Sequence, residues 1–186
     1  MRQTLVPLIL LLCIALLAPL TWAQSPPPAD TLKVDYFANA NTSGAPDAVI
    51  QLTNPNTSGG NIYAAIYIFD PNQEMSECCQ CLLTPDGLRT VWINPDLTGN
   101  PLTGVTLTTG LIKVVSTTGS NASKLVPKPA VRGWATHLQN TTFAATETAM
   151  PDATLSSAEM TRLQQECGGI LTDGSGHGIC TCGSGD

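Results

Sequence analysis

The pentapeptide Glu77-Cys78-Cys79-Gln80-Cys81 places three cysteines side by side in the middle of the chain. A second group of three, formed by Cys167, Cys180 and Cys182, follows about ninety residues later. Bonds inside the first group would close very small rings, far from the preferred geometry of a disulfide. We therefore expect each cysteine of the first group to pair with one of the second, which leaves six connectivities open. The C-terminal segment is predicted to be clamped to the middle of the chain.

The first 23 residues have the pattern of a secretory signal peptide. Arg2 precedes an apolar run over 5–20, and small residues lead up to a predicted cleavage after Ala23. A short proline-rich leader over 24–30 follows. An uncleaved anchor is the alternative, but the run is short for a membrane span and contains two prolines. We expect a secreted protein, extracellular or periplasmic, with no membrane span once the signal is removed.

Composition excludes one class of partner. The chain has 186 residues, a formal net charge of −6, and only 12% charged residues. Its few basic residues are scattered, whereas binding to nucleic acid needs clustered cations. We expect no nucleic-acid partner. Removal of the signal leaves enough residues for one domain with a sizeable core.

Short apolar or alternating segments, separated by turns rich in Pro, Gly and Asn, predict a mainly β fold. We expect an antiparallel β-sandwich, immunoglobulin-like or similar, over 31–150. The segment 61–69 is apolar on both faces, which predicts a central strand covered on both sides. The predicted strands are 31–40, 48–54, 61–69, 88–93, 110–117, 131–140 and 142–149.

Two connecting segments have specific turn or helix chemistry. Asp70-Pro71 has the pattern of a helix start, which predicts one helical turn through Ser76 that leads into the cysteines. The related stretches 94–99 and 100–104 each begin with Asn-Pro and end with Gly, which predicts two successive turns.

One helix is predicted near the C-terminus. Ser156 and Glu159 form a capping box, and Met160, Leu163 and Cys167 share one helical face. Glycine at 168 is the expected end of this helix. Residues 151–186 are predicted to form this helix and a cysteine-containing tail, packed on the same domain.

No catalytic constellation is recognised in the sequence. His137 lies in a predicted strand, where a packed or surface role is expected, and His177 lies in a glycine-rich tail that cannot orient a base. Asp70 with Glu74 or Glu77 could be a carboxylate pair, but capping and solvation explain these residues more simply. We predict no catalytic, cofactor-binding or metal-binding residue, no cofactor, and no enzymatic activity.

The cysteines have a competing interpretation as metal ligands. Cys-Cys-x-Cys, Cys-x-Cys and His177 could in principle hold zinc or copper. The spacing is not that of common zinc modules, and an exported chain meets oxidising conditions. We predict disulfides at Cys78, Cys79, Cys81, Cys167, Cys180 and Cys182.

The run from Phe69 to Cys81, FDPNQEMSECCQC, with its continuation to Leu88, resembles a signature of secreted bacterial proteins of unknown function. The resemblance implies export and bacterial origin, and it implies no activity.

These observations favour an exported, non-enzymatic protein with a structural, adhesive or assembly role in the cell envelope or extracellular space. Its expected partners are envelope or matrix components, or further copies of itself through an exposed edge strand. The alternative is a secreted module that binds a metal or small ligand through the cysteine cluster.

Overall fold

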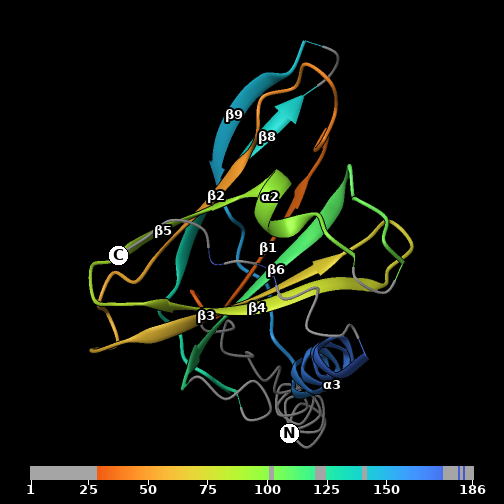
Figure 1. Cartoon of the computed structure of the whole chain (residues 1–186). Coiled ribbons are helices and arrows are strands. Elements are labelled where there is room, and N and C mark those ends of the chain that lie inside the picture. The colour runs from red at the N-terminus through yellow and green to blue at the C-terminus, as the bar shows by residue number, and fades with distance from the viewer. Residues whose placement is uncertain are drawn as a thin grey trace, which may run out of the picture.

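A computed structural model describes residues 29–100, 103–119, 125–139, 142–173, Cys180 and Cys182. The predicted signal peptide and most of the proline-rich leader lie outside these residues. Two antiparallel sheets pack face to face, and a C-terminal helix covers the outer surface of one sheet (Figure 1). The prediction of a mainly β sandwich with one C-terminal helix is confirmed.

The first sheet has the strand order β1-β6-β3-β4, and the short strand β7 pairs with β6. The strand β3 pairs with β4 on one side and with β6 on the other, so the apolar segment is central as predicted. The bounds are β1 Leu32–Phe37, β3 Ile62–Phe69, β4 Met75–Leu83, β6 Gly110–Thr118 and β7 Val126–Pro127. Neither β4, the strand that carries the first group of cysteines, nor β7 was among the strands predicted from the sequence.

The second sheet has the strand order β5-β2-β8-β9. Its inward-facing residues alternate with outward-facing ones, as expected for a sheet with one solvated face. Every residue of the edge strand β9 is exposed. The bounds are β2 Val49–Thr53, β5 Leu88–Trp92, β8 Arg132–Gln139 and β9 Ala144–Ala149.

The core has two parts because β3 is apolar on both faces. Ile62, Ala64, Ile66 and Ile68 belong to the cluster between the two sheets. The alternate residues Ala65, Tyr67 and Phe69 belong to a second cluster, which also contains Met160, Leu163, Cys167 and Ile170 of the helix α3 (Ser157–Asp173). The helix therefore adds a third layer on the first sheet, visible in Figure 1.

The helical turn predicted between Asp70 and Ser76 is wrong. The Asp70 carboxylate accepts hydrogen bonds from the backbone N–H groups of Asn72 and Glu74, both at 2.9 Å. Gln73 has a positive φ of 71°, and the chain turns back at once into β4. A side-chain acceptor for following N–H groups is common to helix caps and to Asx turns, so the local sequence did not distinguish them.

Two other local predictions need correction. The first of the two turns predicted over 94–104 is a short helix, α2 (Ile93–Leu97). The C-terminal helix does not end at Gly168 but continues to Asp173. Ile170 is buried against the first sheet, and this burial outweighs the low helix propensity of Gly168 and Gly169.

The segment after β9 covers part of the edge of β1. The backbone N–H of Val34 donates to the carbonyl of Pro151 at 3.1 Å, and that of Ala153 donates to Leu32 at 2.9 Å. The ammonium of the buried Lys33 lies 2.8 Å from carboxylate oxygens of both Asp30 and Asp152. Burial of Lys33 opposes its charge, but these two carboxylates outweigh that effect and raise its pKa. Among the described residues, no helix has the length and apolar character needed to cross a membrane.

Candidate functional site: the cysteine cluster

The strand β4 presents its cysteines to both faces of the first sheet. Cys79 and Cys81 belong to the cluster between the sheets, whereas Cys78 belongs to the cluster beneath α3. All three side chains are buried. This division follows from the strand period of two, which sends adjacent residues to opposite faces.

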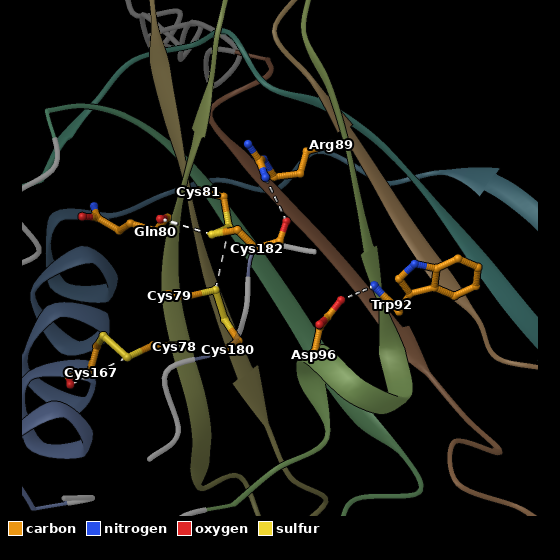
Figure 2. The surroundings of a disulfide bond; sticks show 10 residues. All are labelled: Cys78, Cys79, Gln80, Cys81, Arg89, Trp92, Asp96, Cys167, Cys180 and Cys182. Atoms are coloured by element: carbon orange, nitrogen blue, oxygen red, sulfur yellow. Dashed lines mark hydrogen bonds between the residues drawn. A yellow bond between two sulfur atoms is a disulfide. The ribbon is translucent and has the colours of Figure 1, made fainter. Parts of the chain in front are cut away.

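Each cysteine of β4 is bonded to one cysteine of the C-terminal region. The pairs are Cys78–Cys167, Cys79–Cys180 and Cys81–Cys182, with Cα–Cα distances of 5.8, 5.2 and 5.4 Å. This is one of the six connectivities that the sequence left open. It contains no bond within the first group of cysteines, and Figure 2 shows the three bonds on the two faces of β4.

The two tail cysteines lie beside β4 in a parallel register. Cys79 is bonded to Cys180, and two residues further along both segments Cys81 is bonded to Cys182. The N–H of Cys180 donates to the carbonyl of Cys78 at 3.3 Å, which is the bond expected between parallel neighbours. Because β4 is the last strand on its side of the sheet, the tail cysteines cover an edge that would otherwise be open.

Arg89 on β5 donates hydrogen bonds to both β4 and the tail. Its Nη1 donates to the carbonyl oxygen of Cys182 and its Nε to that of Leu82, both at 3.3 Å. One side chain of the second sheet thus contacts both β4 and the tail, as Figure 2 shows for Cys182.

Four sulfur atoms gather where the two tail disulfides lie side by side. The sulfurs of Cys79 and Cys81 are 3.9 Å apart, and those of Cys79, Cys81 and Cys182 all lie within 4.8 Å of one another. Reduced thiolates at these positions are the ligands that soft metal ions prefer. In the disulfide-bonded chain the same sulfurs are joined in pairs, so the cluster acts as a crosslink. His177, the other ligand weighed from the sequence, lies outside the described residues.

Glu77 extends the inner face of β4 and is a buried carboxyl group. It is 6% exposed, and burial raises its pKa to about 8. The neighbouring Asp96 of α2 acts in the same direction, while a hydrogen bond from the N–H of Gly99 acts against it. A side chain at position 99 would displace this carboxyl group, and glycine leaves room for it. The sequence favours a solvated Glu77, and its observed burial corrects that interpretation.

His137 is buried between the sheets rather than exposed in a site. Its Nε2 lies 3.0 Å from the hydroxyl of Thr148 and 3.3 Å from a carboxylate oxygen of Asp35. A catalytic relay needs the acid and the nucleophile on different ring nitrogens. Here Thr148 and Asp35 both contact Nε2 of His137, so these three residues do not form a catalytic relay.

Asp70 and Glu77, which the sequence did not favour as a carboxylate pair, lie in different surroundings. Asp70 organises the exposed turn between β3 and β4, and Glu77 is enclosed within the sandwich. A cavity of about 430 Å³ lies beside this turn, against α3. Its lining is formed by Gln73, Glu74, Met75, Asn100, Thr103, Glu166, Gly169 and Ile170.

A second cavity, of about 330 Å³, contains a compensated group of charges. The cationic groups of Lys113 and Arg162 each lie 5.0 Å from the ring centroid of Phe69. Both cations are paired with Glu159, and the hydrogen bond from Arg162 is the main cause of its lowered pKa. The group ties the first turns of α3 to β6, and its geometry fits a structural contact.

Comparisons with known proteins find no matching family model, no matching curated protein and no matching solved structure. The fold and the cysteine cluster define the class of the chain as a disulfide-clamped β-sandwich with a C-terminal helix.

Proposed function

We propose that the chain is an exported, non-enzymatic protein that serves a structural or adhesive role in the cell envelope or extracellular space. The observation that carries this proposal is the set of three disulfides joining β4 to the helix and tail. Disulfides form and persist in oxidising compartments outside the cytosol. The signal-peptide pattern of residues 1–23 supports the same compartment.

The arrangement of the disulfides suits a protein that must persist outside the cell. They anchor the helix, which covers one face of the first sheet, and they fix tail residues over an open strand edge. Both effects reduce the surface that is open to proteases and to edge-to-edge aggregation. Persistence of this kind is what a matrix or envelope component needs.

Cell fractionation tests this proposal directly. The full chain is expressed with its leader in a bacterium, and the exported and cytosolic fractions are probed for the protein. We expect an oxidised protein shortened at its N-terminus in the exported fraction, which sediments with isolated envelope or self-associates. Retention in the cytosol, or a strictly monomeric protein that binds no envelope component, would contradict the proposal.

A second candidate function is favoured by the positions of three sulfurs. Those of Cys79 and Cys81 on β4 and of Cys182 in the tail lie close enough together to hold Zn²⁺ or Cu⁺ as three thiolates if the disulfides were reduced. Elemental analysis of the protein purified without reductant distinguishes the two functions. A bound stoichiometric metal favours this site, and a metal-free chain that lacks six hydrogens favours the clamp.

A further inference from the structure

The outward face of the second sheet carries both tryptophans of the described chain. Trp92 ends β5, and Trp134 lies on β8. Trp92 is 43% exposed, and its indole ring points away from Asp96 and the disulfides in Figure 2. The third tryptophan of the sequence, Trp22, belongs to the predicted signal peptide. Two residues of a type that is costly to expose are thus placed on one solvated surface.

The strand register places the two rings on the same face. On β2, which lies between them, Val49 is opposite Trp92 and Gln51 is opposite Trp134. The alternate residues Ile50, Val91 and Ala135 are buried in the core between the sheets. Strand spacing and rise then separate the two tryptophan Cα atoms by roughly 12 Å. Two indoles at this spacing form a platform several sugar rings long.

Most of the side chains around the two rings are polar and uncharged, and the apolar Val49 is opposite Trp92. Gln51, Thr90 and Thr136 supply amide and hydroxyl groups beside the indoles, and none of the three is fully buried. Two charges of opposite sign adjoin these residues. Arg132 lies two residues before Trp134 on β8 and is paired with Asp30 at 3.5 Å, and Glu147 is opposite Thr136 on the edge strand β9. The centre of this surface therefore has groups for hydrogen bonding and for stacking but no field that attracts an ion.

We propose that this face of the second sheet binds an extended, neutral polysaccharide of β-linked pyranose rings. Such rings carry C–H bonds on their flat faces, which pack against an indole, and hydroxyl groups at their rims, which bond to amide and hydroxyl side chains. The two tryptophans supply the stacking, and Gln51, Thr90 and Thr136 supply the rim contacts. The inference rests on the extracellular role proposed above and names the class of partner for adhesion.

The side chains on this face favour a neutral polysaccharide over a second copy of the chain or a nucleic acid. A second copy of the chain would favour a continuous apolar centre, whereas here the polar Gln51, Thr90 and Thr136 lie beside the two rings. Nucleic acid would need clustered cations, whereas Arg132, which the strand register places on this face, is paired with Asp30.

Indole fluorescence gives a direct test, because every tryptophan of the chain outside the predicted signal peptide lies on this face. The protein, purified after expression of the full chain, is titrated with soluble mixed-linkage β-glucan and mixed with insoluble cellulose and chitin. We expect retention on at least one of these polymers and a change in indole emission that saturates with the soluble one. A folded protein that binds none of the three overturns the inference.

Substitutions then locate the binding. Trp92→Ala and Trp134→Ala should each weaken binding about tenfold or more, since isolated aromatic anchors dominate such contacts. Trp134→Phe, which keeps a ring at a less exposed position, should weaken it by a smaller factor while preserving the fold. Tyr36→Ala is the matched control, because Tyr36 is 53% exposed but lies on β1 of the first sheet. Its affinity should equal that of the original chain.

Two results would contradict the proposed face even if binding is observed. One is binding that all tryptophan variants retain, and the other is a dimer, measured by sedimentation, that Trp92→Ala dissociates. The first places the polysaccharide elsewhere, and the second assigns the face to another copy of the chain. Failure here leaves the proposed export and clamp intact, because fractionation and disulfide analysis test those separately.

Discussion

Cys78 and Cys79 are neighbours in the chain, yet their side chains lie on opposite faces of β4 and hold different segments. Cys78 bonds to Cys167 on α3, and Cys79 bonds to Cys180 in the tail. The strand β4 is thereby bonded both to α3, which forms the outer layer on the first sheet, and to the tail cysteines that cover the edge of that sheet. The alternation of side chains along a strand sends these two adjacent cysteines to opposite faces.

The three disulfides should contribute unequally to stability. With Cys79–Cys180 intact, Cys78–Cys167 closes an additional loop of about fourteen residues, worth about 3 kcal/mol in the chain-entropy model. Cys81–Cys182 closes only a ring of a few residues, worth about 2 kcal/mol in the same model. We expect the double variant Cys78→Ser, Cys167→Ser to unfold at a lower denaturant concentration than Cys81→Ser, Cys182→Ser. Equal midpoints in equilibrium denaturation would contradict this order.

Packing of α3 on the first sheet should depend on Leu163. Its side chain is 0% exposed within the cluster between helix and sheet. Leu163→Ala should lower the free energy of unfolding by about 2–5 kcal/mol, because truncation leaves a cavity. Leu171→Ala is the matched control on the same helix, since Leu171 is 37% exposed. Thermal or denaturant unfolding measures both, and a similar loss in the two variants would argue against the observed docking.

Glu77 should make stability depend on pH in an unusual direction. Its pKa is raised to about 8 in the folded chain, so the folded state keeps a proton that the unfolded state loses near pH 4.5. The stability that Glu77 contributes is complete below pH 4.5, falls as pH rises, and is lost above about pH 8. Over this window the loss is on the order of 5 kcal/mol, because each pKa unit of difference between the folded and unfolded states corresponds to about 1.4 kcal/mol.

Glu77→Gln isolates this effect. The amide has a similar shape but does not ionise, so the variant should be more stable than the original chain at pH 9 and lack the decline between pH 5 and 8. Urea unfolding at several pH values measures the difference. A decline of equal size in both proteins would assign the pH dependence to other groups.

Much of the fold follows from short-range patterns in the sequence. The apolar residues on both faces of 61–69 predict its central position in a sheet. The capping box and the apolar stripe predict the C-terminal helix. The disulfides between the two cysteine groups follow from ring size alone. What could not be derived is the connectivity, because it depends on which face of β4 each cysteine occupies and on where α3 docks.

The wrong sequence-based predictions at Asp70, Gly168 and Glu77 have a common physical origin. At Asp70 the same carboxylate chemistry serves a helix cap and an Asx turn, and the pairing of β3 with β4 decides between them. At Gly168 the local signal to stop is overridden by the burial of Ile170 one turn from Cys167. For Glu77 the sequence carries no sign of burial, because the glycine that makes room for it lies at position 99 on another segment. In each case a distant contact outweighs a local preference.

Three specific disulfides join β4 to the helix and tail. Peptide mapping of the protein without reduction, followed by mass spectrometry, checks each of these bonds. Proteases do not cut between the vicinal pair Cys78 and Cys79, so partial reduction and alkylation are needed to assign each bond. The structure predicts that Cys78 is linked to Cys167, Cys79 to Cys180 and Cys81 to Cys182, with no free thiol among the six. A bond within Cys78, Cys79 and Cys81, or free thiols that hold a metal, would contradict it.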